Sequence, residues 1–146
     1  RGNWRLRAAA MSTFSPFVAA LHVFIGGGFG AVLRWQLGRA MTGWLGAPVV
    51  TAFPFATLAA NAAGSLAMGL LAGWLARHGS GEGEQLRLLL GVGLLGGFTT
   101  FSAFSLEMVL LIERGQYLFA LLYAVLSIAL GITGLMVGLG VMRMAG

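Results

Sequence analysis

Three polar side chains recur along one face of an otherwise apolar segment. Thr57, Asn61 and Ser65 are spaced i, i+4 and i+8, and this spacing places them on one side of a helix. An amide and two hydroxyls in such a row can donate hydrogen bonds to an anion. They can also join one helix to the next, which is the usual role of an isolated Ser or Thr among apolar helices. Asn61 favours a binding role, because its amide needs several partners.

A second, shorter row follows later in the chain. Tyr123 and Ser127 are i, i+4, and Gly131, the next position on that face, has no side chain. The row could extend a track of donors. A buried Tyr hydroxyl also finds a partner for structural reasons alone, so both interpretations stay open.

The run GGFTTFSAFS, residues 96–105, interrupts a third apolar segment. Paired glycines weaken a helix, and Thr hydroxyls compete for its backbone. In lipid, irregular backbone persists only where protein buries it or a water-filled cavity receives it, so the run predicts an ion site. Phe101, Phe104, Ser105 and Met108 then share one face of the resumed helix. Their rings can pack in a core, or can turn positive edges toward an anion.

Two charged residues lie inside these segments. Arg34 can extend its long side chain to the segment end or draw anions into a vestibule. Glu107 is interpreted as a structural ion-pair or helix-orienting residue that reaches a headgroup, a water-filled crevice or Arg34, and a proton-carrying role is the alternative. His22 and His78 lie near segment ends and have no metal-ligand pattern around them.

The composition is that of an integral membrane protein. Of the 146 residues 58% are hydrophobic and 9% are charged. The net charge of +5 comes from arginines that mostly mark segment ends, so we expect no nucleic-acid partner. The chain has no cysteine, which excludes disulfides, thiolate metal sites and cysteine nucleophiles.

Four segments are long enough to cross a bilayer, at about 17–41, 53–76, 86–112 and 117–142. Connections are expected at 42–52 and 77–85, which are rich in turn residues, and at 113–115. Residues 1–10 are interpreted as a leader or upstream extension outside the fold. Residues 11–146 then form a single four-helix transmembrane domain in the cell (inner) membrane.

The charges at the segment ends barely specify an orientation. Arg77, Arg87 and Arg143 oppose Arg39 and Arg114 across the membrane. Insertion both ways round would permit an antiparallel homodimer. Glycine pairs four residues apart predict close helix packing, at 26 and 30, 69 and 73, 93 and 97, and 134 and 138. Four closely packed helices leave little room for an internal path, so we expect a homo-oligomer.

The chain resembles the Fluc/CrcB family of fluoride channels. The resemblance spans about residues 25–138 and rests on GGGFGAVLRW at 26–35, ATLAANAAGS at 56–65 and GGFTTFSAFSLE at 96–107. It implies an all-α membrane protein, a third helix broken at mid-membrane, and an antiparallel dual-topology homodimer with two fluoride pores. It also implies a central sodium ion that is structural and is not transported.

The resemblance also assigns roles to individual residues. The backbone carbonyls of Gly96 and Thr99 would hold the sodium. The fluoride pathway would comprise Phe101 and Phe104 through their ring edges, Asn61 through its amide, Tyr123 and Ser127 as a polar track, and Thr57 and Ser65 on the face of Asn61.

The function expected from this is passive fluoride export that lowers cytoplasmic fluoride and its toxicity. The alternative is a proton-coupled exporter of the small multidrug type, in which Glu107 would carry the proton. A non-transporting membrane scaffold is a third possibility. An enzyme is not expected, because the sequence has no acid pair, no nucleophile with a base and no metal cluster.

Overall fold

The structure, a computed structural model, describes residues 15–78 and 83–145 and is helical throughout those ranges, apart from short connections. The predicted leader, residues 1–10, lies outside the described residues. In chain order the helices are α2 (Pro16–Leu45), α3 (Ala47–Ala52), α4 (Phe55–His78), α5 (Gly83–Leu86), the π-helix η1 (Arg87–Leu95), α6 (Gly96–Phe98), α7 (Phe101–Glu113) and α8 (Tyr117–Met144).

Four spans are long and apolar enough to cross a membrane. They are α2, α4, the composite span Gly83–Glu113, and α8. The prediction of four crossings is confirmed on length and composition. The composite span contains α5, η1, α6 and α7, so one crossing is built from several short pieces.

The connection between the first two spans, predicted at residues 42–52, lies between Leu45 and Phe55 and is largely helical. α2 continues to Leu45, and α3 begins one residue after Gly46. Gly46 has φ 84°, a conformation that Gly adopts without strain, and its N–H donates to Thr42 O at 3.0 Å. Pro48 lies in the first turn of α3, where its missing N–H costs nothing. The expected turn signals therefore mark a corner between two helices.

Two residues inside the third span have extended backbone. α6 ends at Phe98, Thr99 has ψ 158°, and Thr100 has ψ 124°. α7 then starts at Phe101, where the Thr100 hydroxyl accepts from Ala103 N at 3.2 Å as an N-cap. The Thr side chain thus fixes where the new helix begins.

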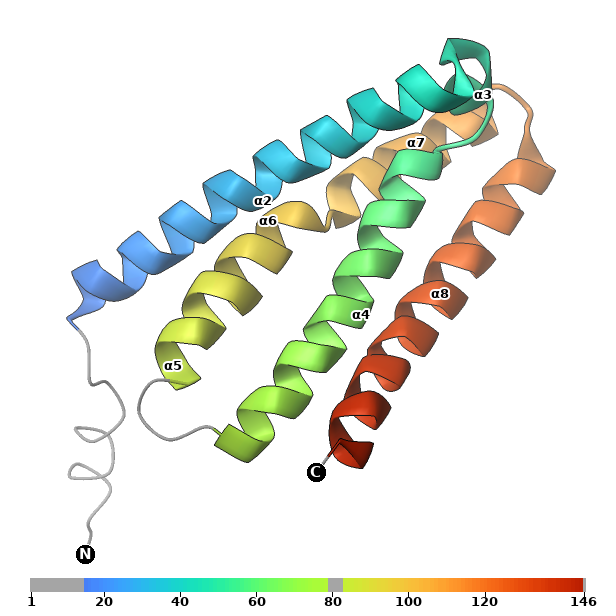
Figure 1. Ribbon diagram of the computed structural model, residues 1–146. Coiled ribbons are helices and arrows are strands. Elements are labelled where there is room, and N and C mark those ends of the chain that lie inside the picture. The colour runs from blue at the N-terminus through green and yellow to red at the C-terminus, as the bar shows by residue number, and fades with distance from the viewer. Residues whose placement is uncertain (1–14, 79–82, 146) are drawn as a thin grey trace, which may run out of the picture.

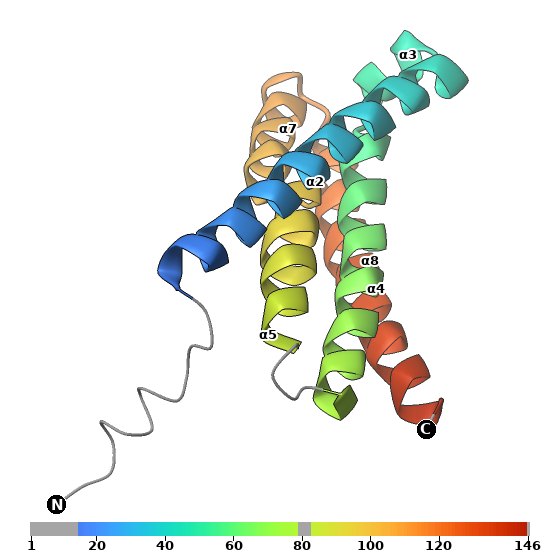
Figure 2. The ribbon, with the colours of Figure 1, turned by 60° about the vertical axis from the view of Figure 1, so that its left-hand side comes forward.

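The helices pack in two close pairs. α2 lies against η1 and α6, and α4 lies against α8 (Figure 1). Figure 2 shows α2 crossing the other helices obliquely. The predicted glycine pairs lie at these two contacts. A Cβ at Gly93 would come within 2.9 Å of Gly26 Cα, and one at Gly138 within 2.5 Å of Leu66 O. Backbones approach there more closely than a side chain would allow.

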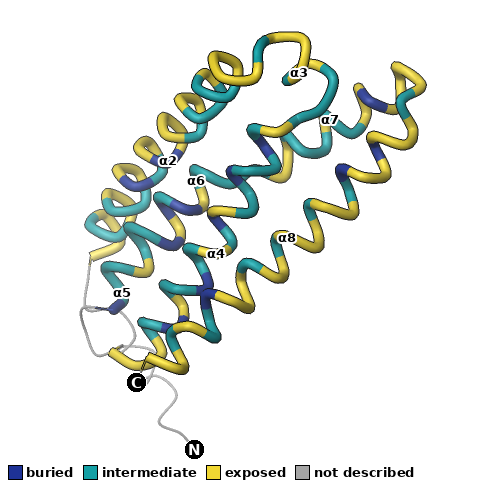
Figure 3. Tube along the Cα trace, turned by 45° about the vertical axis from the view of Figure 1, so that its right-hand side comes forward, coloured by how far each residue is buried: buried dark blue, intermediate teal, exposed yellow. Residues whose placement is uncertain are grey.

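Buried residues are few among the described residues, and exposed residues make up much of α2 and α8 (Figure 3). The one cluster of buried apolar residues joins α7 to α8 and comprises Leu111, Ala120 and Tyr123 within the described ranges. Large apolar residues such as Phe24, Trp44 and Met136 are exposed. Such outward-facing apolar surface is what lipid or another apolar helix would cover.

The close contact at Gly138 gives a testable expectation for stability. Gly138→Ala places a methyl group against the backbone of Leu66 and Leu70 and should lower the free energy of unfolding by about 1–3 kcal/mol. Thermal unfolding in detergent measures this. Gly140→Ala is the matched control, because a Cβ at Gly140 meets nothing within 4 Å. Equal effects of the two substitutions would contradict the packing argument.

Candidate functional site

The side chain of Asn61 binds the backbone at the interruption between α6 and α7. Its Oδ1 accepts from Thr100 N at 2.8 Å, and its Nδ2 donates to Thr100 O at 3.1 Å. One amide on α4 therefore satisfies both main-chain groups of one residue on the third span. Because Nδ2 carries two hydrogens, one N–H is still available to a ligand.

At the interruption, the N–H groups of Thr100 and Ala103 donate to side chains instead of to the backbone carbonyls that they would meet in a helix. In a continuous helix Thr100 N would donate to Gly96 O, and Ala103 N would donate to Thr99 O. Here Thr100 N donates to Asn61 and Ala103 N donates to the Thr100 hydroxyl. The carbonyls of Gly96 and Thr99 are thereby released from the helical ladder. Carbonyl oxygens are hard ligands, so this pair fits a hard cation.

Clusters of acidic, His or Cys side chains are the usual protein sites for a metal ion. Among the described residues, no group of three His, Cys, Asp or Glu is placed to hold a metal ion.

A cavity of about 380 Å³ opens beside the interruption. It brings together six of the residues selected from the sequence, namely Asn61, Ser65, Thr99, Phe101, Phe104 and Ser127. The Ser127 hydroxyl is buried and has no hydrogen-bond partner among the described residues. A buried hydroxyl without a partner is costly, and Ser127 can donate to a group that enters this cavity. Gly131 also lines the cavity and leaves room beside Ser65.

Aromatic rings form one wall of this cavity. The centroids of Phe101 and Phe104 lie 5.8 Å apart, and Phe104 lies 5.0 Å from the ring of Tyr123. Phe104 packs against the buried cluster, whereas Phe101 is 79% exposed. The two Phe residues thus differ, since one is anchored in the fold and the other projects from it.

Thr57 and Tyr123 do not line the cavity. Both donate to Glu107, Thr57 Oγ1 to Oε1 at 2.7 Å and Tyr123 OH to Oε2 at 2.6 Å. Thr57 is 8% exposed and Tyr123 is fully buried. Each carboxylate oxygen of Glu107 therefore has a hydroxyl donor. The sequence analysis missed this pairing, although a carboxylate in an apolar segment requires donors, and these two hydroxyls were among the candidates.

Arg34 lies in α2 and does not line the cavity beside Asn61. Its Nε is buried and has no hydrogen-bond partner among the described residues. Glu107 lines an open cavity at one end of the bundle, which fits the crevice among its predicted surroundings, and its carboxylate accepts from Thr57 and Tyr123. The vestibule role of Arg34 stays a prediction.

Comparison with known proteins places the chain in a family. The family model described as CrcB-like protein, Camphor Resistance (CrcB), matches residues 21–139. A protein of Erythrobacter litoralis named fluoride-specific ion channel FluC is 59% identical over 134 residues, which cover 92% of this chain and 98% of that protein. Proteins of the same name from Novosphingobium aromaticivorans (59%, covering 86% and 96%) and Phenylobacterium zucineum (51%, covering 83% and 92%) are also similar. The chain is therefore a multi-pass membrane protein that belongs to the CrcB-like family.

Proposed function

We propose that the protein is a fluoride channel that lets fluoride leave the cytoplasm passively and so lowers its toxicity there. The observation that supports this most is the cavity beside Asn61, which combines hydroxyl and amide donors with aromatic rings. The relatives are named fluoride-specific ion channels, and membership of an ion-channel family excludes an enzyme.

The chemistry of the cavity suits a small, strongly hydrated anion. A selective path must replace the water around fluoride with donors and must fit larger halides poorly. The hydroxyls of Ser65 and Ser127 and the free N–H of Asn61 would replace water. The rings of Phe101 and Phe104 would narrow the path and present their positive edges. The flow would follow the fluoride gradient without a coupled ion.

We further propose an antiparallel dual-topology homodimer in which the third span is broken at mid-membrane. Two copies related by a two-fold axis would bring together four carbonyl oxygens, from Gly96 and Thr99 of each copy. These oxygens would hold one sodium ion that is structural and is not transported. The diverted hydrogen bonds of Thr100 and Ala103 support this proposal, because they leave those carbonyls without their helical donors.

The alternative of a proton-coupled exporter depends on Glu107. Both oxygens of this carboxylate accept short hydrogen bonds from hydroxyls on α4 and α8. Such contacts favour a group that ties three spans together over one that exchanges protons with a transported substrate.

Fluoride efflux from reconstituted vesicles tests the channel proposal. Wild-type protein should pass fluoride and retain chloride, as followed with ion-selective electrodes. Phe101→Ala removes an aromatic contact of about 0.5–1.5 kcal/mol and should slow fluoride efflux by up to about tenfold. Phe24→Ala is the matched control, because Phe24 is 77% exposed and Phe101 is 79% exposed. Chloride passing as readily as fluoride would refute the proposal.

Sodium dependence tests the carbonyl site. Replacing sodium with N-methylglucamine should lower the melting temperature of the wild-type protein, since a bound ion stabilises the folded state. In Asn61→Leu we expect Thr100 N to donate to Gly96 O instead, so the effect of sodium on the melting temperature should disappear. Thr100 O also loses its donor, so the free energy of unfolding should fall by about 1–3 kcal/mol. Ser65→Ala, one turn away on the same helix, should keep the sodium effect. Loss of the sodium effect in Ser65→Ala, or no sodium effect in the wild type, would count against the carbonyl site.

Glu107→Gln separates the channel from the exporter. An amide has one acceptor oxygen, so Thr57 or Tyr123 loses its acceptor, and stability should fall by about 1 kcal/mol or more. Fluoride efflux should not depend on a pH gradient in either protein. Glu113→Gln, at the exposed end of α7, serves as the control. Proton-driven uptake of an organic cation that is lost only in Glu107→Gln would favour the exporter.

A further inference from the structure

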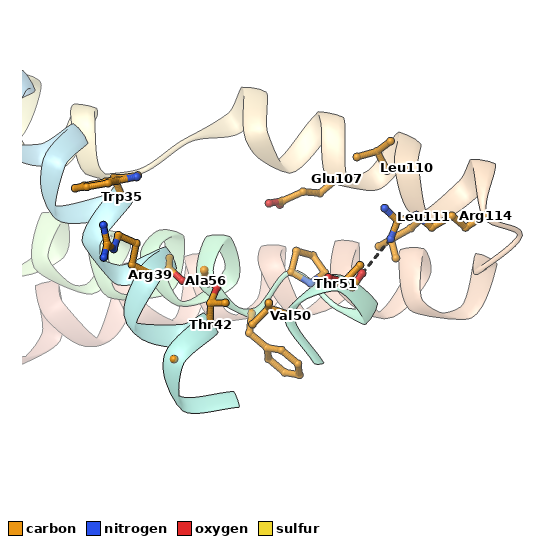
Figure 4. Close-up of a pocket in the computed structure, with 14 residues that line it drawn as sticks. Trp35, Arg39, Thr42, Val50, Thr51, Ala56, Glu107, Leu110, Leu111 and Arg114 are labelled. Carbon is orange, nitrogen blue, oxygen red and sulfur yellow. Dashed lines mark hydrogen bonds between the residues drawn. The ribbon is translucent and has the colours of Figure 1, made fainter. Parts of the chain in front are cut away.

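A second, larger cavity of about 820 Å³ lies where α2, α3, the start of α4 and the end of α7 meet. Figure 4 shows Trp35 and Arg39 on one side of it, Leu110 and Arg114 on the other, and Glu107 between them. None of the polar residues around the Asn61 cavity lines it. It is a separate hollow at one end of the bundle.

The two arginines in this cavity can bind a further anion. The Arg39 guanidinium lies 5.1 Å from the centre of the Trp35 ring, which leaves its edge N–H groups free to donate. Arg114 Nη1 donates to Thr51 O at 3.0 Å, the one hydrogen bond drawn among the lining residues in Figure 4. A guanidinium carries five N–H donors, so Arg114 keeps most of them for a ligand.

Glu107 moderates the charge of the cavity without cancelling it. Both of its oxygens are used by Thr57 and Tyr123. Two arginines against one carboxylate leave the lining with a net positive charge. An anion would therefore lie toward Arg39 and Arg114 and away from the inner wall.

An apolar hollow of about 480 Å³ adjoins the charged cavity. Phe55 lines both, and α3 separates them, since Val50 and Thr51 face the charged cavity while Pro48 and Val49 face the apolar one. Phe53, Phe119, Leu122 and Leu126 complete the apolar side. A cationic compartment thus lies next to an apolar one, at the end of four apolar spans where headgroups meet hydrocarbon.

We propose that these two compartments together bind one anionic phospholipid. The headgroup phosphate contacts Arg39 and Arg114 on the side of the cavity away from Glu107, and an acyl chain occupies the apolar hollow beyond Phe55. The Trp35 ring holds the Arg39 guanidinium at the wall of the cavity. A free phosphate would use the arginines but would leave the adjoining apolar hollow unfilled, so the structure favours the lipid. The inference does not depend on which ion the protein conducts.

Native mass spectrometry of the full chain in detergent, titrated with phosphatidylglycerol, tests the proposal. Arg39→Gln with Arg114→Gln should weaken lipid retention by roughly tenfold or more, because each arginine near a headgroup contributes about fivefold in affinity. The matched control is Arg87→Gln with Arg143→Gln, which removes the same charge from the start of η1 and the end of α8, the opposite end of the bundle (Figure 1). The control should retain lipid as the wild type does.

A second variant and a second ligand distinguish the source of the phosphate. Val49→Trp fills the apolar hollow, keeps both arginines, and should also weaken retention of phosphatidylglycerol. Inorganic phosphate should not raise the melting temperature of the wild type as the lipid does. Suppose that inorganic phosphate raised the melting temperature of the wild type and that Val49→Trp retained phosphatidylglycerol as the wild type does. The ligand of this cavity would then be a free anion and not a lipid. A wild-type dimer that retains no more lipid than the arginine variant would overturn the proposal and indicate that a second copy covers the cavity.

Discussion

The reciprocal pair of hydrogen bonds between Asn61 and Thr100 is the interaction on which the rest of the site depends. An extended residue inside an apolar span leaves a donor and an acceptor that lipid cannot satisfy. Asn is well suited to satisfy both, because its amide offers an acceptor and a donor side by side. Without this side chain Thr100 N would lose its acceptor and Thr100 O its donor. The interruption is therefore held from α4, by a residue 39 positions away in the chain.

Thr99 and Thr100 satisfy the backbone at the two helix ends that meet here. Thr99 turns both its N–H and its hydroxyl back to Leu95 O, at 2.9 and 2.8 Å, and so ends α6. Thr100 turns its hydroxyl forward to Ala103 N and so starts α7. Their side chains supply on each side the hydrogen bonds that a helix end lacks. The carbonyls of Gly96 and Thr99 are released as a consequence of how the two helix ends are satisfied.

The length of the apolar segments predicted the four spans, and the spacing of polar and aromatic residues predicted most of the residues that gather around Asn61. It placed Thr57, Asn61 and Ser65 on one face of α4, but a face does not say which neighbouring helix each residue meets. Thr57 lies near Glu107, whereas Ser65 lies in the cavity, because α4 meets different helices along its length. The helix α3 was missed for a related reason, since Gly46 and Pro48 are compatible with a loop and with a corner between helices.

The register of α7 explains how one short helix serves several sites. Once Thr100 fixes its first turn, residues three apart drift slowly around the helix as it rises. Phe101 and Phe104 consequently face the cavity at Asn61, Glu107 faces the hydroxyls of α4 and α8, and Leu110 and Arg114 reach the charged cavity at the end of the bundle. A shift of one residue in the start of α7 would rotate all of them by about 100°. The Thr100 cap and its anchor on Asn61 therefore position residues up to four turns away, and loss of the anchor would disturb the aromatic wall and the Glu107 contacts together.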